Sequence, residues 1–215
     1  MLSKQKVLTT IVQTGAMLIV RPESAKEALA VSRAAVSGGF RALEITLSFP
    51  GALEVISILS AQYAQKGIAI GAGTVLDAQA AFAAIQAGAS ILVSPNLDPA
   101  MIRTANRYQI VTISGAFTPT EVVQTLEAGA DIVKLFPTAP AGPDYVRALL
   151  APLPQAPILP AGGATSQNVR AWFAAGATAV GVGSFVTRAA RLDGDLGHVT
   201  RASEEILAAI AAARS

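Results

Sequence analysis

Short apolar segments alternate with longer amphipathic segments along the whole chain. Apolar, β-branched runs of about four to eight residues are typical of buried strands, and apolar residues spaced three or four apart are typical of helices that bury one face. On this pattern we expect strands at residues 16–21, 41–47, 68–75, 90–94, 110–114, 131–136, 156–160 and 179–182. We expect helices at residues 2–13, 24–37, 50–66, 77–87, 99–108, 119–128, 144–150, 167–175 and 201–212.

Local signals support the ends of these elements. Ser24, followed three residues later by Glu27, has the pattern of a capping box, and Asp77 is suited to cap another helix. Several helices end in a small residue and a glycine just before the next strand, as in Gln-Ala-Gly-Ala and Glu-Ala-Gly-Ala. This phrase recurs about every 20–25 residues, which is natural for a compact barrel.

Eight strands that each precede a helix predict a parallel sheet, because parallel neighbours need a crossover connection. The strand number and the length of 215 residues favour a (β/α)₈ TIM barrel with an extra N-terminal helix. An open doubly wound sheet is the alternative. No linker or low-complexity segment interrupts residues 1–215, so we expect a single domain.

Composition narrows the classes of function. The chain is 52% hydrophobic and 14% charged, which predicts a large core and a subunit interface that absorbs surplus apolar surface. The net charge is only +2, and the lysines and arginines are scattered along the sequence without a run, so nucleic acid is not an expected partner. Without cysteine, disulfides and thiolate metal sites are excluded. We find no signal peptide and no membrane span, and expect a soluble, cytoplasmic protein.

The segment Asp131–Pro137 contains the most unusual residue of the sequence, since Lys134 lies inside a predicted buried strand. Burying an ammonium group is costly. The side chain can therefore be paired with a carboxylate or reach solvent, or it can be kept neutral by desolvation and act as a nucleophile toward a carbonyl carbon.

Barrels of this class carry their function at the carboxyl ends of the strands, which makes several polar residues candidates. Arg21 ends the first predicted strand, Thr74 the third, and Pro95 follows the fourth. Glu44 lies within the apolar second strand. Inward side chains of one barrel layer come from alternate strands, so Glu44 and Lys134, in strands two and six, can share a layer. The presence of these two charged residues in apolar strands is explained both by a structural ion pair and by a catalytic acid–base pair.

Two glycine turns end the barrel pattern. Gly162 and Gly163 follow the seventh strand, and Gly183 and Ser184 follow the eighth. Loops at these positions are the recurrent phosphate site of the fold, although glycine turns also serve packing alone. His198, the single histidine, follows two aspartates and is interpreted as a solvated loop residue, and dispersed carboxylates predict no metal site.

These motifs resemble the 2-keto-3-deoxy-6-phosphogluconate and -phosphogalactonate aldolases, the class I enzymes of the KDPG/KHG aldolase type. The matching pieces occur in family order across nearly the whole chain: Leu18–Arg21, Leu43–Leu47, Gly71–Leu76, Ser94–Asn96, Lys134–Pro137, Gly162–Gly163 and Gly181–Ser184. The resemblance implies a trimeric barrel that needs no cofactor and cleaves a phosphorylated sugar acid into pyruvate and glyceraldehyde 3-phosphate.

The resemblance also implies residue roles. Lys134 would form the imine and Glu44 would move protons. Thr74 and the adjoining glycine turn would hold the pyruvate carboxylate, and Gly163, Gly183 and Ser184 would hold the phosphate. Pro95 and Gly162 would also bind the substrate. Arg21 would recognise the substrate carboxylate or a hydroxyl. One departure is Ser48, where phosphogluconate-type members commonly carry arginine; Ser48-Phe49-Pro50 is more similar to the phosphogalactonate branch.

Other functions stay open on the sequence alone. A 4-hydroxy-2-oxoglutarate aldolase would use the same lysine on an unphosphorylated substrate. A phosphosugar isomerase or decarboxylase, or a non-catalytic phosphosugar-binding barrel, would share the phosphate loops without forming an imine.

Overall fold

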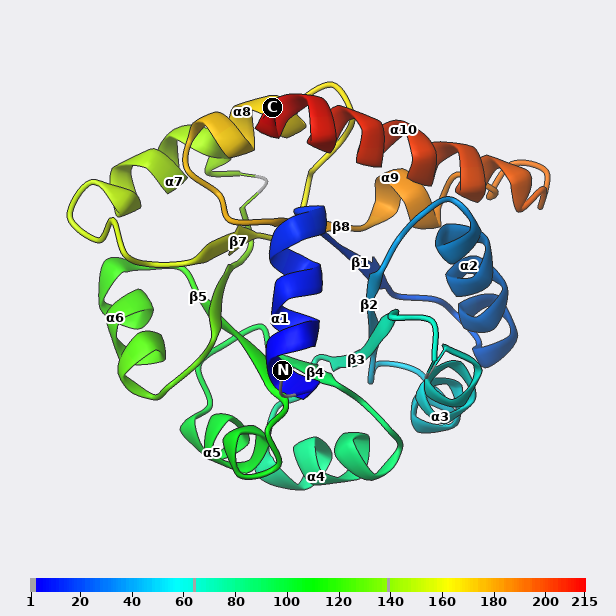
Figure 1. The fold of residues 1–215 in the computed structure, drawn as a ribbon, viewed down its shortest axis with the longest axis horizontal. Coiled ribbons are helices and arrows are strands. Elements are labelled where there is room, and N and C mark those ends of the chain that lie inside the picture. The colour runs from blue at the N-terminus through cyan, green and yellow to red at the C-terminus, as the bar shows by residue number, and fades with distance from the viewer. Residues whose placement is uncertain (1–2, 64, 139) are drawn as a thin grey trace.

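The computed structural model describes residues 3–63, 65–138 and 140–215 and shows a parallel eight-stranded sheet. The strand order is β7-β6-β5-β4-β3-β2-β1-β8. An isolated parallel bridge between Ala161 and Gly181 lies where β7 and β8 meet, so the sheet curls into a nearly closed barrel with the helices outside it (Figure 1). The predicted (β/α)₈ barrel with an extra N-terminal helix is confirmed.

The strands are β1 (Ala16–Val20), β2 (Ala42–Thr46), β3 (Ala69–Gly73), β4 (Ile91–Val93), β5 (Val111–Ala116), β6 (Ile132–Leu135), β7 (Ile158–Pro160) and β8 (Val180–Val182). The helices are α1 (Ser3–Thr14), α2 (Ala25–Ser37), α3 (Ala52–Tyr63), α4 (Ala78–Gln86), α5 (Pro99–Arg107), α6 (Pro119–Glu127), α7 (Gly142–Leu150), α8 (Val169–Ala174), α9 (Ser184–Thr187) and α10 (Gly197–Arg214). Across the described ranges, each helix is too short or too polar to cross a bilayer.

Each predicted strand and helix has a counterpart in the structure, and the differences lie at the ends. The terminal helix begins at Gly197 rather than at residue 201, for example, and β3 is shorter than the predicted strand 68–75. The four-residue helix α9 was not predicted. Two residues of the predicted helices, Leu2 and Ala64, lie outside the described residues.

Helix caps follow the sequence signals closely. The Ser24 side chain accepts the backbone N–H of Glu27, and Asp77 caps α4 in the same way. The Glu27 carboxylate accepts the N–H of Glu23 instead of closing the box on Ser24. A complete capping box starts α6, where Thr118 and Glu121 satisfy each other's backbone N–H groups.

The core forms two layers, one inside the barrel and one between the sheet and the helices. The inner layer includes the first residue of several strands, such as Ala42, Ile91 and Val111. Helix α1 lies across the amino-terminal end of the barrel (Figure 1), and its fully buried Ile11 belongs to this inner layer. Helix α1 therefore covers this end of the barrel, and the carboxyl ends of the strands are left for a site.

A polar network holds α1 in place. Lys4 Nζ lies 2.9 Å from Asp131 Oδ2 and donates to Asn106 Oδ1 at 2.8 Å. The same aspartate oxygen accepts the backbone N–H and the hydroxyl of Thr112. Since Asp131 directly precedes β6, these contacts tie the closing helix to the strand that carries Lys134.

Candidate active site

Glu44 and Lys134 face each other inside the barrel. Lys134 Nζ lies 3.4 Å from Glu44 Oε1, and the two side chains are 5% and 0% exposed. The strands that carry them, β2 and β6, are alternate strands of the barrel, which is the relation expected for residues of one layer. The second carboxylate oxygen of Glu44 has no hydrogen-bond partner among the described residues. A buried acceptor without a partner is available to a substrate hydroxyl or a water.

Glycine on the neighbouring strand makes room for the glutamate. Gly73 ends β3 and is paired in register with Thr46 of β2. A Cβ at Gly73 would lie 2.0 Å from Glu44 Oε1 and 2.4 Å from its Cγ, so any side chain there would displace the carboxylate. The absence of a side chain at Gly73 therefore leaves the space that the Glu44 carboxylate occupies.

A similar contact supports the strand of the lysine. Lys134 is paired in register with Gly115 of β5. A Cβ at Gly115 would lie 2.1 Å from the backbone carbonyl atoms of Pro95. The loop after β4 thus packs directly against β5 beside Lys134, and it places Pro95 near the predicted nucleophile. The Phe136 ring centroid lies 5.5 Å from Lys134 Nζ.

A cavity of about 220 Å³ opens above Lys134 at the carboxyl ends of the strands. Most of the predicted site residues line it, namely Lys134, Arg21, Gly162, Gly163, Gly183 and Ser184. Ile19, Phe136, Ala161, Thr187 and Arg188 complete the lining. Glu44 reaches the site through its contact with Lys134, whereas Thr74 and Pro95 lie outside this lining.

A larger cavity, of about 400 Å³, lies at the opposite end of the barrel beside α1. Lys6 and several hydroxyl groups line it, and the Ser60 and Ser90 hydroxyls donate to backbone carbonyls. Its lining includes no carboxylate and none of the predicted site residues. The smaller cavity at Lys134 is therefore the candidate active site.

The two glycine turns form one wall of this cavity. Gly162 and Gly163 have positive φ values of 110° and 81°, which favour glycine. A Cβ at Gly162 or at Gly183 would meet no atom within 4 Å, so both backbones face open space. Because no side chain separates this backbone from the cavity, an anion can approach its N–H groups closely and be bound by them.

Thr74 adopts an unusual conformation just after β3, with a φ value of 58°. A positive φ is rare for a β-branched residue and requires the surrounding structure to hold it. Glu44 lies in the middle of β2 and Thr74 follows the neighbouring strand β3, and Gly73, which precedes Thr74, packs against Glu44. The strained residue is thus next to the buried acid.

Other polar residues brace the site and were missed in the sequence. The Asn168 amide donates to Gly163 O at 2.7 Å, and its Oδ1 accepts the N–H of Thr165. The fully buried Thr138 donates to Ala161 O at 3.0 Å. These bonds hold the turn after β7 to its helix and to the segment after β6. From the sequence alone, an asparagine or threonine outside a strand that hydrogen-bonds to the backbone of the site cannot be distinguished from one that is exposed to solvent.

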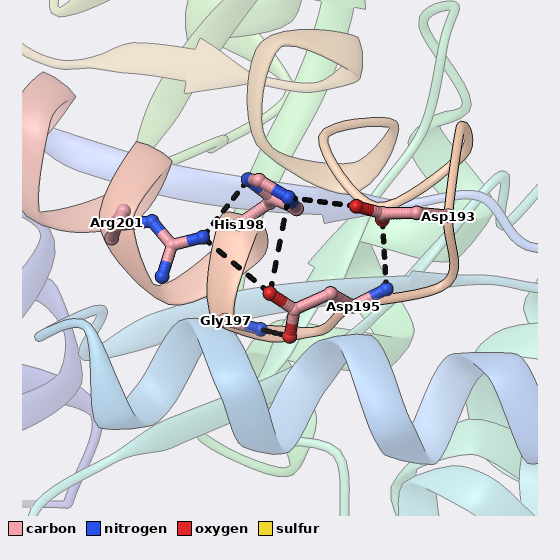
Figure 2. Close-up of polar contacts among 5 residues, drawn as sticks. All are labelled: Asp193, Asp195, Gly197, His198 and Arg201. Carbon is pink, nitrogen blue, oxygen red and sulfur yellow. Dashed lines mark hydrogen bonds and ion pairs between the residues drawn. The ribbon is translucent and has the colours of Figure 1, made fainter.

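His198 lies apart from the cavity, in an exposed cluster after α9. Figure 2 shows its ring between Asp193 and Arg201; His198 Nε2 lies 3.0 Å from Asp193 Oδ2, and Arg201 lies 3.0 Å from Nδ1. The backbone N–H of Asp195 and the His198 ring lower the pKa of Asp193. None of these side chains lines the cavity that contains Lys134.

The family model for KDPG and KHG aldolases matches residues 8–202. The 2-dehydro-3-deoxy-6-phosphogalactonate aldolase of Escherichia coli (strain K12) is 38% identical over 172 residues, which cover 80% of this chain and 83% of the relative. The KHG/KDPG aldolase of the same strain is 29% identical over 199 residues, covering 91% of this chain and 92% of the relative. A solved structure described as native KDPGal superposes with a TM-score of 0.85 at 32% identity and covers 93% of this chain and 95% of that chain.

Proposed function

Since the chain belongs to the KDPG and KHG aldolase family, we propose that Lys134 is the Schiff-base lysine and Glu44 the proton carrier of its aldolase reaction. The enzyme is an aldolase that cleaves a 2-keto-3-deoxy-6-phospho sugar acid to pyruvate and D-glyceraldehyde 3-phosphate. The observation that carries the residue roles is the buried contact of 3.4 Å between the two side chains beside an open cavity.

The reaction needs an electron sink, and Lys134 is placed to supply it. Its amine attacks the C2 ketone, water leaves through a carbinolamine, and a protonated imine forms. When the bond between C3 and C4 breaks, its electron pair moves toward the iminium nitrogen and gives a neutral enamine. Protonation at C3 and hydrolysis of the imine then release pyruvate and restore the lysine.

Glu44 can move the proton that this sequence requires. Its unpaired Oε2 accepts the proton of the C4 hydroxyl, directly or through a water, as the bond breaks and the aldehyde forms. The same proton then passes to C3 of the enamine, so the carboxylate ends the cycle as it began. One buried group with one free oxygen serves both steps.

The remaining lining residues orient the substrate at its two ends. Gly162, Gly163, Gly183 and Ser184 bind the phosphate through backbone N–H groups and a hydroxyl, and Arg21 binds the carboxylate or a hydroxyl. Thr74 and Pro95 belong to the pyruvate end. Contacts far from the breaking bond mainly position the substrate.

For the sugar we propose the galactonate epimer, which differs from the gluconate epimer at C4. The identity to the phosphogalactonate aldolase is 38%, against 29% to the KHG/KDPG aldolase of the same organism. Ser48 also replaces the arginine of the gluconate type, and its hydroxyl pairs with Thr46 at 2.8 Å.

The two parts of the proposal are tested separately. A coupled assay of pyruvate release with both phosphorylated epimers should give a kcat/KM at least about tenfold higher for the galactonate; equal values would remove the epimer assignment. Glu44→Gln should still form an imine with pyruvate, while kcat falls about 100-fold or more, as expected for loss of a general acid–base group. Wild-type turnover in Glu44→Gln would exclude this residue.

We further propose a cytoplasmic homotrimer. The phosphate of such a substrate ultimately comes from ATP, and cells keep ATP in the cytoplasm. Exposed apolar side chains gather near α3, α4 and α5, including Leu53, Leu76, Phe82 and Tyr108, and surfaces of this kind mark protein interfaces. Light scattering should give the mass of three 21.9 kDa chains; the mass of one chain would contradict the trimer.

A further inference from the structure

Arg188 brings a second arginine to the cavity, in addition to Arg21. It follows α9 directly and lines the same 220 Å³ cavity as Lys134 and the two glycine turns. The backbone N–H of Arg188 donates to Ser184 O at 3.1 Å, so the two residues are one helical turn apart. Residues four apart along a helical turn lie on one face. The Ser184 hydroxyl and the Arg188 guanidinium therefore approach the cavity from the same side.

The guanidinium of Arg188 is free to take a ligand. Among residues 3–63, 65–138 and 140–215, no side chain forms an ion pair or hydrogen bond with it. Arg191 lies three residues later in the same loop and differs from Arg188 in two ways. Its guanidinium is paired with a carboxylate, at 3.3 Å from Glu23 Oε1, and its side chain does not line the cavity. Glu27 shares a small side cavity with both arginines and forms no ion pair with either.

The two glycine turns by themselves give a phosphate only neutral donors, although Arg21 and Lys134 line other parts of the same cavity. The turns after β7 and β8 offer backbone N–H groups and the Ser184 hydroxyl, whereas a phosphate monoester carries about −1.5 to −2 charges at pH 7. A planar guanidinium matches phosphate oxygens with two parallel hydrogen bonds. Arg21 lies at the end of β1 and remains available for the other end of the substrate.

We propose that Arg188 binds the substrate phosphate and makes the enzyme prefer phosphorylated over unphosphorylated sugar acids. This inference rests on the proposed function of the Lys134 site, because it assigns the phosphate end of the same substrate. Arg188 has no part in imine formation or proton transfer. Its loss therefore acts on the binding of the phosphorylated substrate and leaves the chemistry at Lys134 intact.

The test compares Arg188→Gln and Arg188→Lys with Arg191→Gln, a matched control from the same loop. Each variant is assayed for pyruvate release from the 6-phosphorylated substrate and from its unphosphorylated analogue, which is neutral at C6. Arg188→Gln should lower kcat/KM for the phosphorylated substrate at least about tenfold, mainly through KM, and change it less than about twofold for the analogue. Arg188→Lys should recover part of the loss, and Arg191→Gln should match the wild type on both.

Inorganic phosphate gives an independent measurement. It should inhibit the wild-type enzyme competitively and inhibit Arg188→Gln at least about tenfold more weakly. Equal losses on both substrates, or an unchanged kcat/KM for the phosphorylated one, would overturn the role of Arg188. Failure of the proposed function is a different result, since the wild-type enzyme would then release no pyruvate from either substrate.

Discussion

Replacing Gly73 by alanine should remove most of the turnover without touching either proposed catalytic residue. The added Cβ would lie 2.0 Å from Glu44 Oε1, 2.4 Å from Cγ and 2.5 Å from Cδ. Unbonded carbon and oxygen atoms need more than about 3 Å, so the carboxylate must move by about 1 Å or more. A displacement of about 1 Å at a reacting group costs about 100-fold in rate. We therefore expect kcat to fall about 100-fold in Gly73→Ala.

The assay separates this displacement from a general disturbance of β3. Gly71→Ala is the matched control, because its Cβ would lie 2.7 Å from Ile91 Cβ and 2.8 Å from Ile91 O while its three nearest contacts include no atom of Glu44. Both variants should lose stability in urea unfolding. Only Gly73→Ala should lose turnover per folded molecule, and it should still form the reduced pyruvate adduct on Lys134.

Two outcomes would refute this reasoning. Wild-type kcat in Gly73→Ala would show that the position of Glu44 does not limit the reaction. Equal losses of kcat in both glycine variants would show that the strand as a whole, rather than the carboxylate, was disturbed.

Two further predictions concern stability. Hydrogen bonds from the backbone N–H groups of Thr118 and Phe117 lower the pKa of Glu121 from its usual 4.5. The ionised Glu121 carboxylate therefore stabilises the folded state fully above about pH 4.5, and this stabilisation is lost as the pH falls through the lower folded-state pKa. Glu121→Gln, at an exposed cap, should lower the free energy of unfolding by up to about 1 kcal/mol at pH 7; in urea titrations the deficit should shrink in acid, and a deficit that grew there would contradict the sign. Asp131→Ala removes the acceptor of Lys4 and Thr112 and should cost about 2–3 kcal/mol in urea unfolding. A cost below about 0.5 kcal/mol would show that this network does not hold α1.

The fold was largely readable because strand and helix patterns repeat with little interruption. The strands β1 to β8 are short, mainly apolar runs with a glycine or proline within a few residues, and such runs have few alternatives in an alternating chain. The helix α9 was missed because four residues are too few to show a helical period. Strand ends were overestimated where the apolar pattern continued beyond the strand, as after Gly73, where Thr74 has a positive φ.

The site was readable only where a residue type conflicted with its local pattern. Glu44 and Lys134 are charged residues within apolar strands. Because side chains of one barrel layer come from alternate strands, the sequence already predicted that these two residues can share a layer. Asn168 directly precedes α8 and Arg188 directly follows α9, and polar residues at helix ends are common enough that the sequence does not reveal where their side chains point. The positive φ of Thr74 was not predictable either, because its β-branched side chain disfavours that conformation and only the surrounding structure holds it.

The central claim is that Lys134, among the five lysines of the chain, forms the imine. The most direct measurement is incubation with pyruvate and borohydride, followed by peptide mass spectrometry of the wild type and of Lys134→Arg. The account predicts one reduced pyruvate adduct, on Lys134, and no adduct in the variant. An adduct on Lys4, Lys6, Lys26 or Lys66, or none on the active wild-type enzyme, would contradict it.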